Sequence, residues 1–390
     1  MSFTFPHPRI HSSFLVSASM PTSERGSTLI ASMRSSRVAQ RTLIALCASA
    51  LLLAACGSSS KPASGSSGTG TKVSGTLNGS GSTFQKTFDQ VAIQAFQSAN
   101  SGATVNYAGG GSGKGKTDLQ TKTVDFAGTD SLVKTADLPK YQGGKILYFP
   151  TVAAPITVSY HVSGVDKLQL SAPTIAKIFA GTVTKWNDPA IAGDNGNATL
   201  PSTDIVAVHR ADASGTTSNF TKYLAAAGGA DWTLGSGDTV KWPANSQAGQ
   251  GNQGVAQAVS KTNGAIGYVD FADALGAQLK MASIKNSAGS FVAPTLAGAS
   301  AAVASATVAA DLTYSPLNES GADAYPITSP TWIIVYANQT DKAKGELLKA
   351  FLTFVLNDGQ GLAAAANYAK LPASLQQQAI AQLTKLQIPA

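Results

Sequence analysis

Four short segments rich in glycine, serine and threonine contain the residues best suited to bind a ligand. In each, a strand-like apolar run ends, small and hydroxyl residues follow, and a helical pattern often begins. Glycine lets the main chain approach a ligand, hydroxyl groups donate hydrogen bonds without adding charge, and a helix N-terminus offers unpaired N–H groups. One such segment alone is typical of an ordinary helix cap, but several together favour a site for a small anion. The segments are 79–84 (GSGSTF), 109–113 (GGGSG), 126–130 (FAGTD) and 210–216 (RADASGT).

The fourth segment begins with Arg210, the single arginine after Cys56 in a stretch that has 22 lysines. A planar guanidinium can donate two parallel hydrogen bonds to an oxyanion, which the lysine ammonium cannot do. The alternative is a structural ion pair, for instance with Asp212. Both can hold together if Asp212 orients Arg210.

Residues 110–117 (GGSGKGKT) match G-x-x-x-x-G-K-[ST], the phosphate-binding loop of many nucleotide-hydrolysing enzymes, and they follow a predicted strand. Such a site also needs a magnesium-binding acid, and no apolar run ending in an aspartate stands out nearby. ATP is scarce outside the cell, where the export signal described below directs the chain. We therefore keep a nucleotide site as the weaker alternative and expect Lys114 and Lys116 to be solvated or to add positive potential at a cleft.

His209, Asp212 and Ser214 are the residue types of a hydrolytic triad. Within six residues on one strand and turn, they cannot reach the geometry of nucleophile, base and orienting acid with each other. After Cys56 there is one further histidine, His161, and there is no cysteine and no G-x-S-x-G motif. We therefore expect no catalytic residues, no metal site and no cofactor.

The formal charge of +7 does not indicate nucleic-acid binding. Five of the 28 basic and one of the 21 acidic residues precede Cys56, which leaves 23 and 20 after it, a formal charge of +3 without a basic cluster. The 43% of hydrophobic residues is enough for one large core or two medium ones.

Residues 33–56 (MRSSRVAQRTLIALCASALLLAAC) have the basic, apolar and small-residue order of a secretory signal. The apolar run 43–55 would span roughly 20 Å as a helix, short of the ~30 Å hydrocarbon core of a membrane. The last residues, LAAC, resemble the bacterial lipobox, which implies a signal peptide over 33–55 and acylation of Cys56. The alternative is an ordinary signal cut elsewhere, with Cys56 free.

Residues 56–75 are rich in glycine and serine, a composition typical of a flexible tether. Residues 1–32 fit no part of the signal. We expect translation to begin at Met33, and a precursor whose mass includes residues 1–32 would refute this.

Beyond the tether, short apolar runs alternate with helical patterns, which favours an α/β fold with largely parallel sheets. The chain beyond the tether has more than 300 residues, which is more than a single hydrophobic core usually organises, so two lobes are expected. The predicted helices cover 84–98, 252–261 and 345–357, and the predicted strands cover 104–108, 124–127, 156–160, 205–210, 265–270 and 332–336.

Taken in order, these stretches resemble the substrate-binding protein of the bacterial phosphate-specific ABC importer over nearly all of 76–390. The residues that carry the resemblance are VNYAGGGSGKG (105–115), VDFAGTD (124–130), FPTV (149–152), IFAGTVTKWNDPAI (178–191), IVAVHRADASGTTSNFTKYL (205–224), TVKWP (239–243), GNQGVAQAV (251–259), GAIGYVDFA (264–272) and YPITSPTW (325–332).

The resemblance implies a two-lobed periplasmic-binding-protein (Venus-flytrap) fold of the phosphate-binding type. We expect lobe I over 76–158 and 331–390 and lobe II over 159–330, with a hinge near 156–160 and 332–336. The implied ligand is inorganic phosphate, and the implied partners are the permease subunits of an ABC importer and the membrane, through Cys56. We expect a monomer.

Carried over by motif, the resemblance assigns phosphate binding to residues of all four segments, with Asp212 behind Arg210. Two departures from the family pattern are Ala213, where glycine is usual, and the pair Lys114 and Lys116. The assigned residues are Thr83, Phe84, Ser112, Asp130, Arg210, Ser214, Gly215 and Thr216.

Asp130 is an unusual residue for an anion site, because a carboxylate repels an anion. Phosphate at neutral pH still has a proton, whose hydrogen bond a carboxylate can accept. Sulfate has no such proton, so its oxygen would face the carboxylate without a hydrogen bond, at a cost of several kcal/mol when buried. We therefore predict a strong preference for phosphate over sulfate. Other readings remain: a phosphate sensor, another oxyanion receptor of the same fold, and an exported enzyme such as a phosphatase.

Overall fold

The computed structural model describes residues 73–196 and 198–390. The predicted signal peptide (33–55), the predicted acylation site Cys56, the extension 1–32 and nearly all of the tether lie outside the described residues. Among the described residues, no helix is both long enough and apolar enough to span a bilayer.

The described chain is organised around one mixed sheet of nine strands, in the order β2-β1-β3-β12-β4-β8-β6-β7, with β9 paired to β4. A second sheet has three strands, β11-β10-β5. The nine strands are β1 Gly75–Gly81, β2 Ala103–Gly109, β3 Phe126–Thr129, β4 Ile146–His161, β6 Val206–Arg210, β7 Gln247–Gly249, β8 Ala265–Asp270, β9 Lys280–Met281 and β12 Thr328–Tyr336, and the other three are β5 Gln169–Leu170, β10 Ser283–Lys285 and β11 Phe291–Val292.

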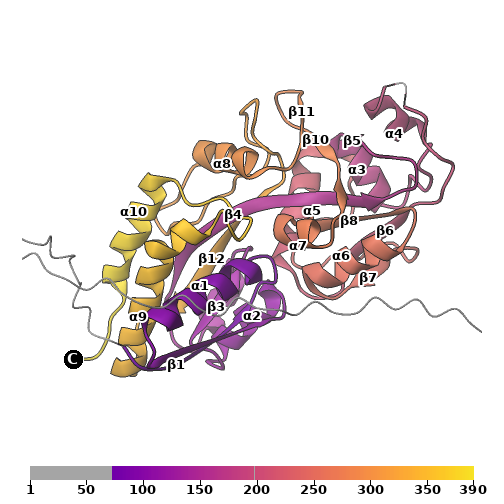
Figure 1. Cartoon of the computed structure of the whole chain (residues 1–390). Helices are drawn as coiled ribbons and strands as arrows, with labels where there is room; N and C mark the ends of the chain where they lie inside the picture. The colour runs from indigo at the N-terminus through magenta and orange to yellow at the C-terminus, as the bar shows by residue number, and fades with distance from the viewer. Residues whose placement is uncertain (1–72, 197) are drawn as a thin grey trace, which may run out of the picture. The chain divides into compact units, whose positions relative to one another are not determined.

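Strand β4 joins two halves of the sheet (Figure 1). Its first part pairs with β12 and its last part pairs with β8, and the partner changes between Pro155, opposite Thr328, and Ile156, opposite Asp270. All but its last residue are buried. We call β2, β1, β3 and β12 with their helices half I, and β8, β6 and β7 with their helices half II.

The expectation of largely parallel sheets is wrong for the centre of the main sheet. Strand β12 runs antiparallel to both β3 and β4, and β4 runs antiparallel to β8. Parallel pairing is confined to the outer strands, β2-β1-β3 in half I and β8-β6-β7 in half II. The α/β class itself is confirmed.

The helices of half I pack apolar faces against the sheet and against one another. In α1 (Lys86–Ala99), the residues Phe88, Ala92 and Phe96 recur at helical spacing and are buried. Phe96 meets Phe351 of α9 edge to face, at 5.3 Å between ring centres. The other helices of this half are α2 Ser112–Gln120, α9 Lys342–Leu356, α10 Ala373–Gln382, η1 Thr135–Lys140, η3 Asp358–Leu362 and η4 Leu383–Lys385.

Half II has an aromatic core between its sheet and helix α5 (Gly215–Ala227). Phe220 stacks on Tyr268 of β8 at 4.4 Å between ring centres, and Phe179 meets Phe220 edge to face at 4.9 Å. The remaining helices are α3 Ala172–Phe179, α4 Pro189–Asp194, α6 Gly251–Lys261, α7 Phe271–Gly276, α8 Leu296–Ser305 and η2 Gly229–Asp231, of which α8 contacts both β4 and β12.

Parallel pairing in each half brings several strand ends to one edge. Gly81 at the end of β1 lies opposite Gly109 of β2 and Gly128 of β3. In half II, Arg210 at the end of β6 lies opposite Gly249 of β7. Carboxyl ends of parallel strands, each followed by a helix N-terminus, are the usual place for a ligand in such sheets.

Candidate functional site

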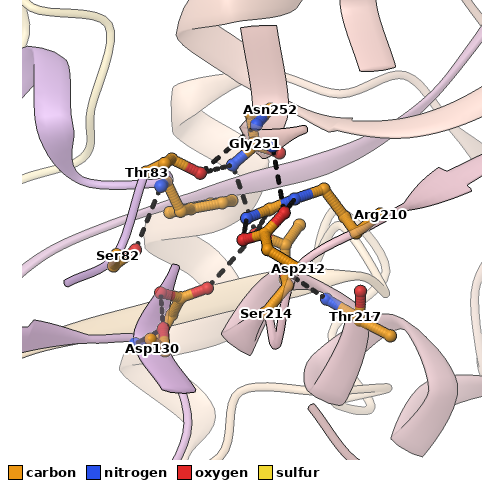
Figure 2. Close-up of polar contacts among 12 residues, drawn as sticks. Ser82, Thr83, Asp130, Arg210, Asp212, Ser214, Thr217, Gly251 and Asn252 are labelled. Carbon is orange, nitrogen blue, oxygen red and sulfur yellow. Dashed lines mark hydrogen bonds and ion pairs between the residues drawn. The ribbon is translucent and has the colours of Figure 1, made fainter. Parts of the chain in front are cut away.

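The four sequence-predicted segments meet where the strand ends of half I face those of half II. Figure 2 shows Ser82, Thr83 and Asp130 on one side and Arg210, Asp212 and Asn252 on the other, with their polar groups turned toward one another. The loop after β1 requires glycine, because Gly81 has φ +138° and an added Cβ there would lie 2.1 Å from the carbonyl oxygen of Gly128. That close approach ties the loop after β1 to strand β3.

Arg210 is 4% exposed, and its side chain donates three hydrogen bonds to two residues. Its Nε donates to Oδ1 of Asp212 at 2.8 Å, its Nη2 donates to Oδ2 of the same carboxylate, and its Nη1 donates to Oγ1 of Thr216 at 3.2 Å. Burial opposes ionisation of Asp212, but the hydrogen bonds and charge of Arg210 outweigh it and lower the pKa of Asp212. The carboxylate therefore stays ionised and fixes the plane of the guanidinium.

Asp130 is 1% exposed and accepts hydrogen bonds on both oxygens. Ser112 Oγ donates to Oδ1 at 2.7 Å, and Thr216 Oγ1 from half II is 3.3 Å from Oδ2. Burial raises the pKa of Asp130, while hydrogen bonds from Ser82 and Ser112 and the charge of Arg210 oppose that rise. The result is a carboxyl group held in place by hydroxyl donors in a water-poor site.

Ser214 and Gly215 form the N-terminus of α5. Ser214 Oγ accepts the main-chain N–H of Thr217 at 3.1 Å, which leaves its own hydroxyl proton free to donate. A Cβ added to Gly215 would lie 2.5 Å from Ser112 Oγ and 2.6 Å from the carboxyl group of Asp130. The N-terminus of α5 thus lies directly against Ser112 and Asp130 of half I because residue 215 has no side chain.

Thr83 and Phe84 differ in what they have left to offer a ligand. Thr83 Oγ1 accepts from the main-chain N–H of Asn252 at 3.2 Å and from its Nδ2 at 3.1 Å, so its proton remains available as a donor. The main-chain N–H of Phe84 donates to Ser82 Oγ at 3.0 Å within its own loop. The Phe84 carbonyl accepts from the hydroxyl of Tyr368 at 2.6 Å.

Asn252 is a residue of this site that the sequence reasoning missed. It is fully buried, contacts Thr83 across the two halves, and lies 3.3 Å from Thr216 Oγ1 through Nδ2. Its Oδ1 accepts from the main-chain N–H of Asp270, which fixes the amide. The available signal was a glycine-started helix after a strand, but that strand, β7, has only three residues. Asn219 was missed as well; its Nδ2 donates to the Asp130 carbonyl.

Of the residues that depart from the family pattern, Ala213 and Lys116 lie at contacts between the halves and Lys114 does not. The carbonyl of Ala213 accepts the N–H of Gly113 at 3.0 Å, and a Cβ on Gly113 would lie 2.4 Å from the Ala213 methyl. Lys116 pairs with Asp238 of half II, whereas Lys114 pairs with Asp118 inside α2. A cleft of about 140 Å³, bordered by Thr83, Gly251 and Asn252, adjoins the site.

The residues that resemble a nucleotide-binding loop and a hydrolytic triad make structural contacts instead. In the match to a nucleotide-binding loop, Lys116 is engaged by Asp238, and Thr117 Oγ1 donates to the carbonyl of Gly113. His209 stacks on Trp242 at 5.1 Å between ring centres, burial lowers its pKa, and Ser214 serves as a helix cap. Within 73–196 and 198–390, no three metal-ligating side chains gather.

The chain is similar in sequence and in fold to known binding proteins. A family model described as the PBP superfamily domain matches residues 66–359. The chain is 36% identical over 335 residues to the phosphate-binding protein PstS 3 of Mycobacterium tuberculosis, covering 81% of this chain and 90% of that protein. It is 38% identical over 291 residues to the phosphate-binding protein PstS of Pasteurella multocida, covering 72% and 82%.

Among solved structures, one similar chain is a high-affinity periplasmic phosphate-binding protein (PfluDING) bound with phosphate. The TM-score is 0.67 at 24% identity, with 79% of this chain and 94% of that chain covered. The phosphate-binding protein of Stenotrophomonas maltophilia gives a TM-score of 0.63 at 21% identity, covering 79% and 94%. At such identities the likeness concerns the fold, and it confirms the predicted periplasmic-binding-protein architecture.

Proposed function

We propose, because this chain belongs to the PstS-type phosphate-binding proteins of the PBP superfamily, that it captures inorganic phosphate between its two halves and delivers it to an ABC-type importer. The observation that carries the proposal is the composition of the site. Buried hydroxyl and helix N-terminal donors, one guanidinium paired with Asp212, and the carboxyl group of Asp130 face one another at a single place. This set can replace the hydration shell of a small tetrahedral anion.

The proposed role of each side chain follows from the hydrogen-bond donors and acceptors that it does not use within the protein. Arg210, oriented by Asp212, supplies the positive charge, and the hydroxyls of Thr83 and Ser214 are donors. Ser112 would have to turn its hydroxyl proton from Asp130 Oδ1 toward the ligand to act as a further donor. The N-terminus of α5 at Gly215 and Thr216 adds main-chain N–H groups. Asp130 accepts the hydrogen bond of the phosphate proton. Phe84 contributes its N–H if Ser82 Oγ releases it.

The two halves would be the lobes of the proposed receptor, with lobe I over 76–158 and 331–390 and lobe II over 159–330. The hinge would lie where β4 exchanges β12 for β8, near Ile156. The return crossing would lie near Ile327, whose carbonyl accepts the N–H of Ile156 at 2.7 Å, and not at the predicted 332–336, which pairs with the first part of β4. Closure of the lobes would bring Arg210 and α5 against Asp130 and Ser112, and opening would release the ligand.

Outside this domain, we propose export by the signal 33–55, acylation of Cys56, and anchoring through a tether to the outer face of the cytoplasmic membrane or in the periplasm. The receptor would act as a monomer, catalyse no reaction and present its closed form to the permease subunits.

Delivery is tested by uptake. Deletion of the gene from its native cell should lower the uptake of radiolabelled phosphate at micromolar concentrations, and the intact gene should restore it while Arg210→Ala should not. Undiminished uptake in the deletion strain, with no second phosphate receptor present, contradicts delivery.

A further inference from the structure

One ion pair crosses between the halves beside the site, and neither partner belongs to the donors assigned to phosphate. Nζ of Lys116, on α2 in half I, lies 2.6 Å from Oδ2 of Asp238, in the loop before β7 in half II. We infer that Lys116 and Asp238 are positioning residues that hold the halves together around bound phosphate and slow its release. This inference rests on the proposed function.

Lys116 also fixes the loop that contains Asp130. Its ammonium donates to Ser131 Oγ at 2.8 Å and to the carbonyl of Leu132 at 3.3 Å. Ser131 is buried and directly follows Asp130. An ammonium has three protons, so these two acceptors and Asp238 use all of them. A change at Lys116 is therefore transmitted to the loop that presents the carboxyl group to the ligand.

Asp238 fixes the corresponding loop of half II. Its carbonyl accepts the main-chain N–H of Ser214 at 2.9 Å, and Ser214 begins the helix whose N-terminus faces the site. One lysine and one aspartate thus connect the Asp130 loop of half I with the Ser214 loop of half II. Because this connection exists only while the halves are in contact, it favours the closed arrangement over the open one.

Because the two side chains are little exposed, their ion pair is stronger than an ordinary surface ion pair. The side chains of Lys116 and Asp238 are 13% and 19% exposed, so water and salt screen them less. Lys114 provides the contrast inside the same motif. It pairs with Asp118 at 2.6 Å one turn along α2, is 54% exposed, and joins nothing in half II.

A second explanation for any effect of Lys116 is simple attraction of its charge for the anion. The two explanations predict opposite changes in phosphate affinity when the charge of Asp238 is removed. Its negative charge is felt at the site, since it adds to burial in raising the pKa of Asp130. Through-space electrostatics predicts that removal of this charge tightens binding of an anion, whereas a positioning role predicts weaker binding.

The experiment is a double-mutant cycle on the full chain with inorganic phosphate as the probe. Lys116→Met, Asp238→Asn and the combined variant are titrated by calorimetry, with Lys114→Met as the matched control for loss of a lysine. Dissociation is measured by chasing radiolabelled phosphate with unlabelled phosphate. A fitted stoichiometry near one phosphate per chain shows that each variant is folded.

Each single variant should raise Kd on the order of tenfold, mainly through faster dissociation, and the combined variant should be no worse than about twice either single one. Lys114→Met should stay within about twofold of wild type. Tighter or unchanged binding by Asp238→Asn overturns the inference, as does a combined loss equal to the product of the single losses. A wild-type chain that binds no phosphate overturns the proposed function and this inference with it, so the two failures are distinguishable.

Discussion

Replacement of Asp130 by asparagine examines how the site distinguishes phosphate from sulfate. The position of the new amide is set by the structure. Ser112 Oγ donates to Oδ1 at 2.7 Å, so the asparagine oxygen keeps that position and its NH₂ group occupies the position of Oδ2. An acceptor on the ligand side of residue 130 thus becomes a donor, with almost no change in volume.

The size of the change in selectivity follows from the free energy of one charge-assisted hydrogen bond for each anion. Phosphate loses an acceptor for its proton, worth about 1.5–3 kcal/mol, and sulfate gains a donor of similar worth in place of a repulsive contact. Removal of the negative charge favours both dianions alike and cancels in the ratio of their Kd values. We therefore expect the preference of phosphate over sulfate to narrow by at least about 100-fold.

Calorimetric titration of wild type and Asp130→Asn with both anions at pH 7 gives the two ratios directly. Ser214→Ala serves as a control that removes a hydroxyl donor with no hydrogen bond to Asp130, so it should weaken both anions and change the ratio little. If the ratio of the sulfate Kd to the phosphate Kd is the same in Asp130→Asn as in wild type, a hydrogen bond from the phosphate proton to Asp130 is not the source of the selectivity.

Three further perturbations have definite expected results. Arg210→Lys should weaken phosphate binding by about 10- to 150-fold in calorimetry, because an ammonium cannot reproduce the two-pronged contact that Asp212 orients, and a loss under threefold would argue against that contact. Gly215→Ala should abolish micromolar phosphate binding, because the new Cβ would lie 2.5 Å from Ser112 Oγ of the other half. The unfolding temperature without phosphate should fall only slightly. Retained affinity would mean that the halves do not close this far. Burial raises the pKa of Asp89 to about 8, against the opposing hydrogen bond from Gln85, so the folded chain keeps a proton that the unfolded chain loses above pH 4. The free energy of unfolding should then fall between pH 4 and 8, by at most ~1.4 kcal/mol per pH unit, and Asp89→Asn should flatten this profile in chemical denaturation; an equal slope in both proteins would place the raised pKa elsewhere.

Local patterns in the sequence predicted several elements closely. Strand β8 has the predicted bounds, and α1 begins two residues later than expected because the loop 82–85 delays it. Strand β3 begins two residues late for a similar reason, since the run before it is bent. Of β4, only the last part was predicted. Pro150 and Pro155 argue against a central strand, yet the structure tolerates them, with a register shift opposite Pro150.

The candidate site was predicted as a set of segments, and the structure brings those segments together. What the sequence could not supply was pairing over long distance. The contact between Lys116 and Asp238 joins residues 122 apart in the chain, and Asn252 reaches Thr83 over 169. The antiparallel centre of the sheet has the same cause, because an apolar run shows that a strand is buried but not the direction of its neighbours.

We conclude that this site binds a tetrahedral anion and selects one whose proton can donate to Asp130. One calorimetric titration of the purified full chain with orthophosphate, repeated with sulfate, tests it most directly. We expect one phosphate per chain to bind at micromolar concentration or below and sulfate to bind at least about 100-fold more weakly. No heat of binding with micromolar phosphate, or equal affinity for the two anions, would contradict it.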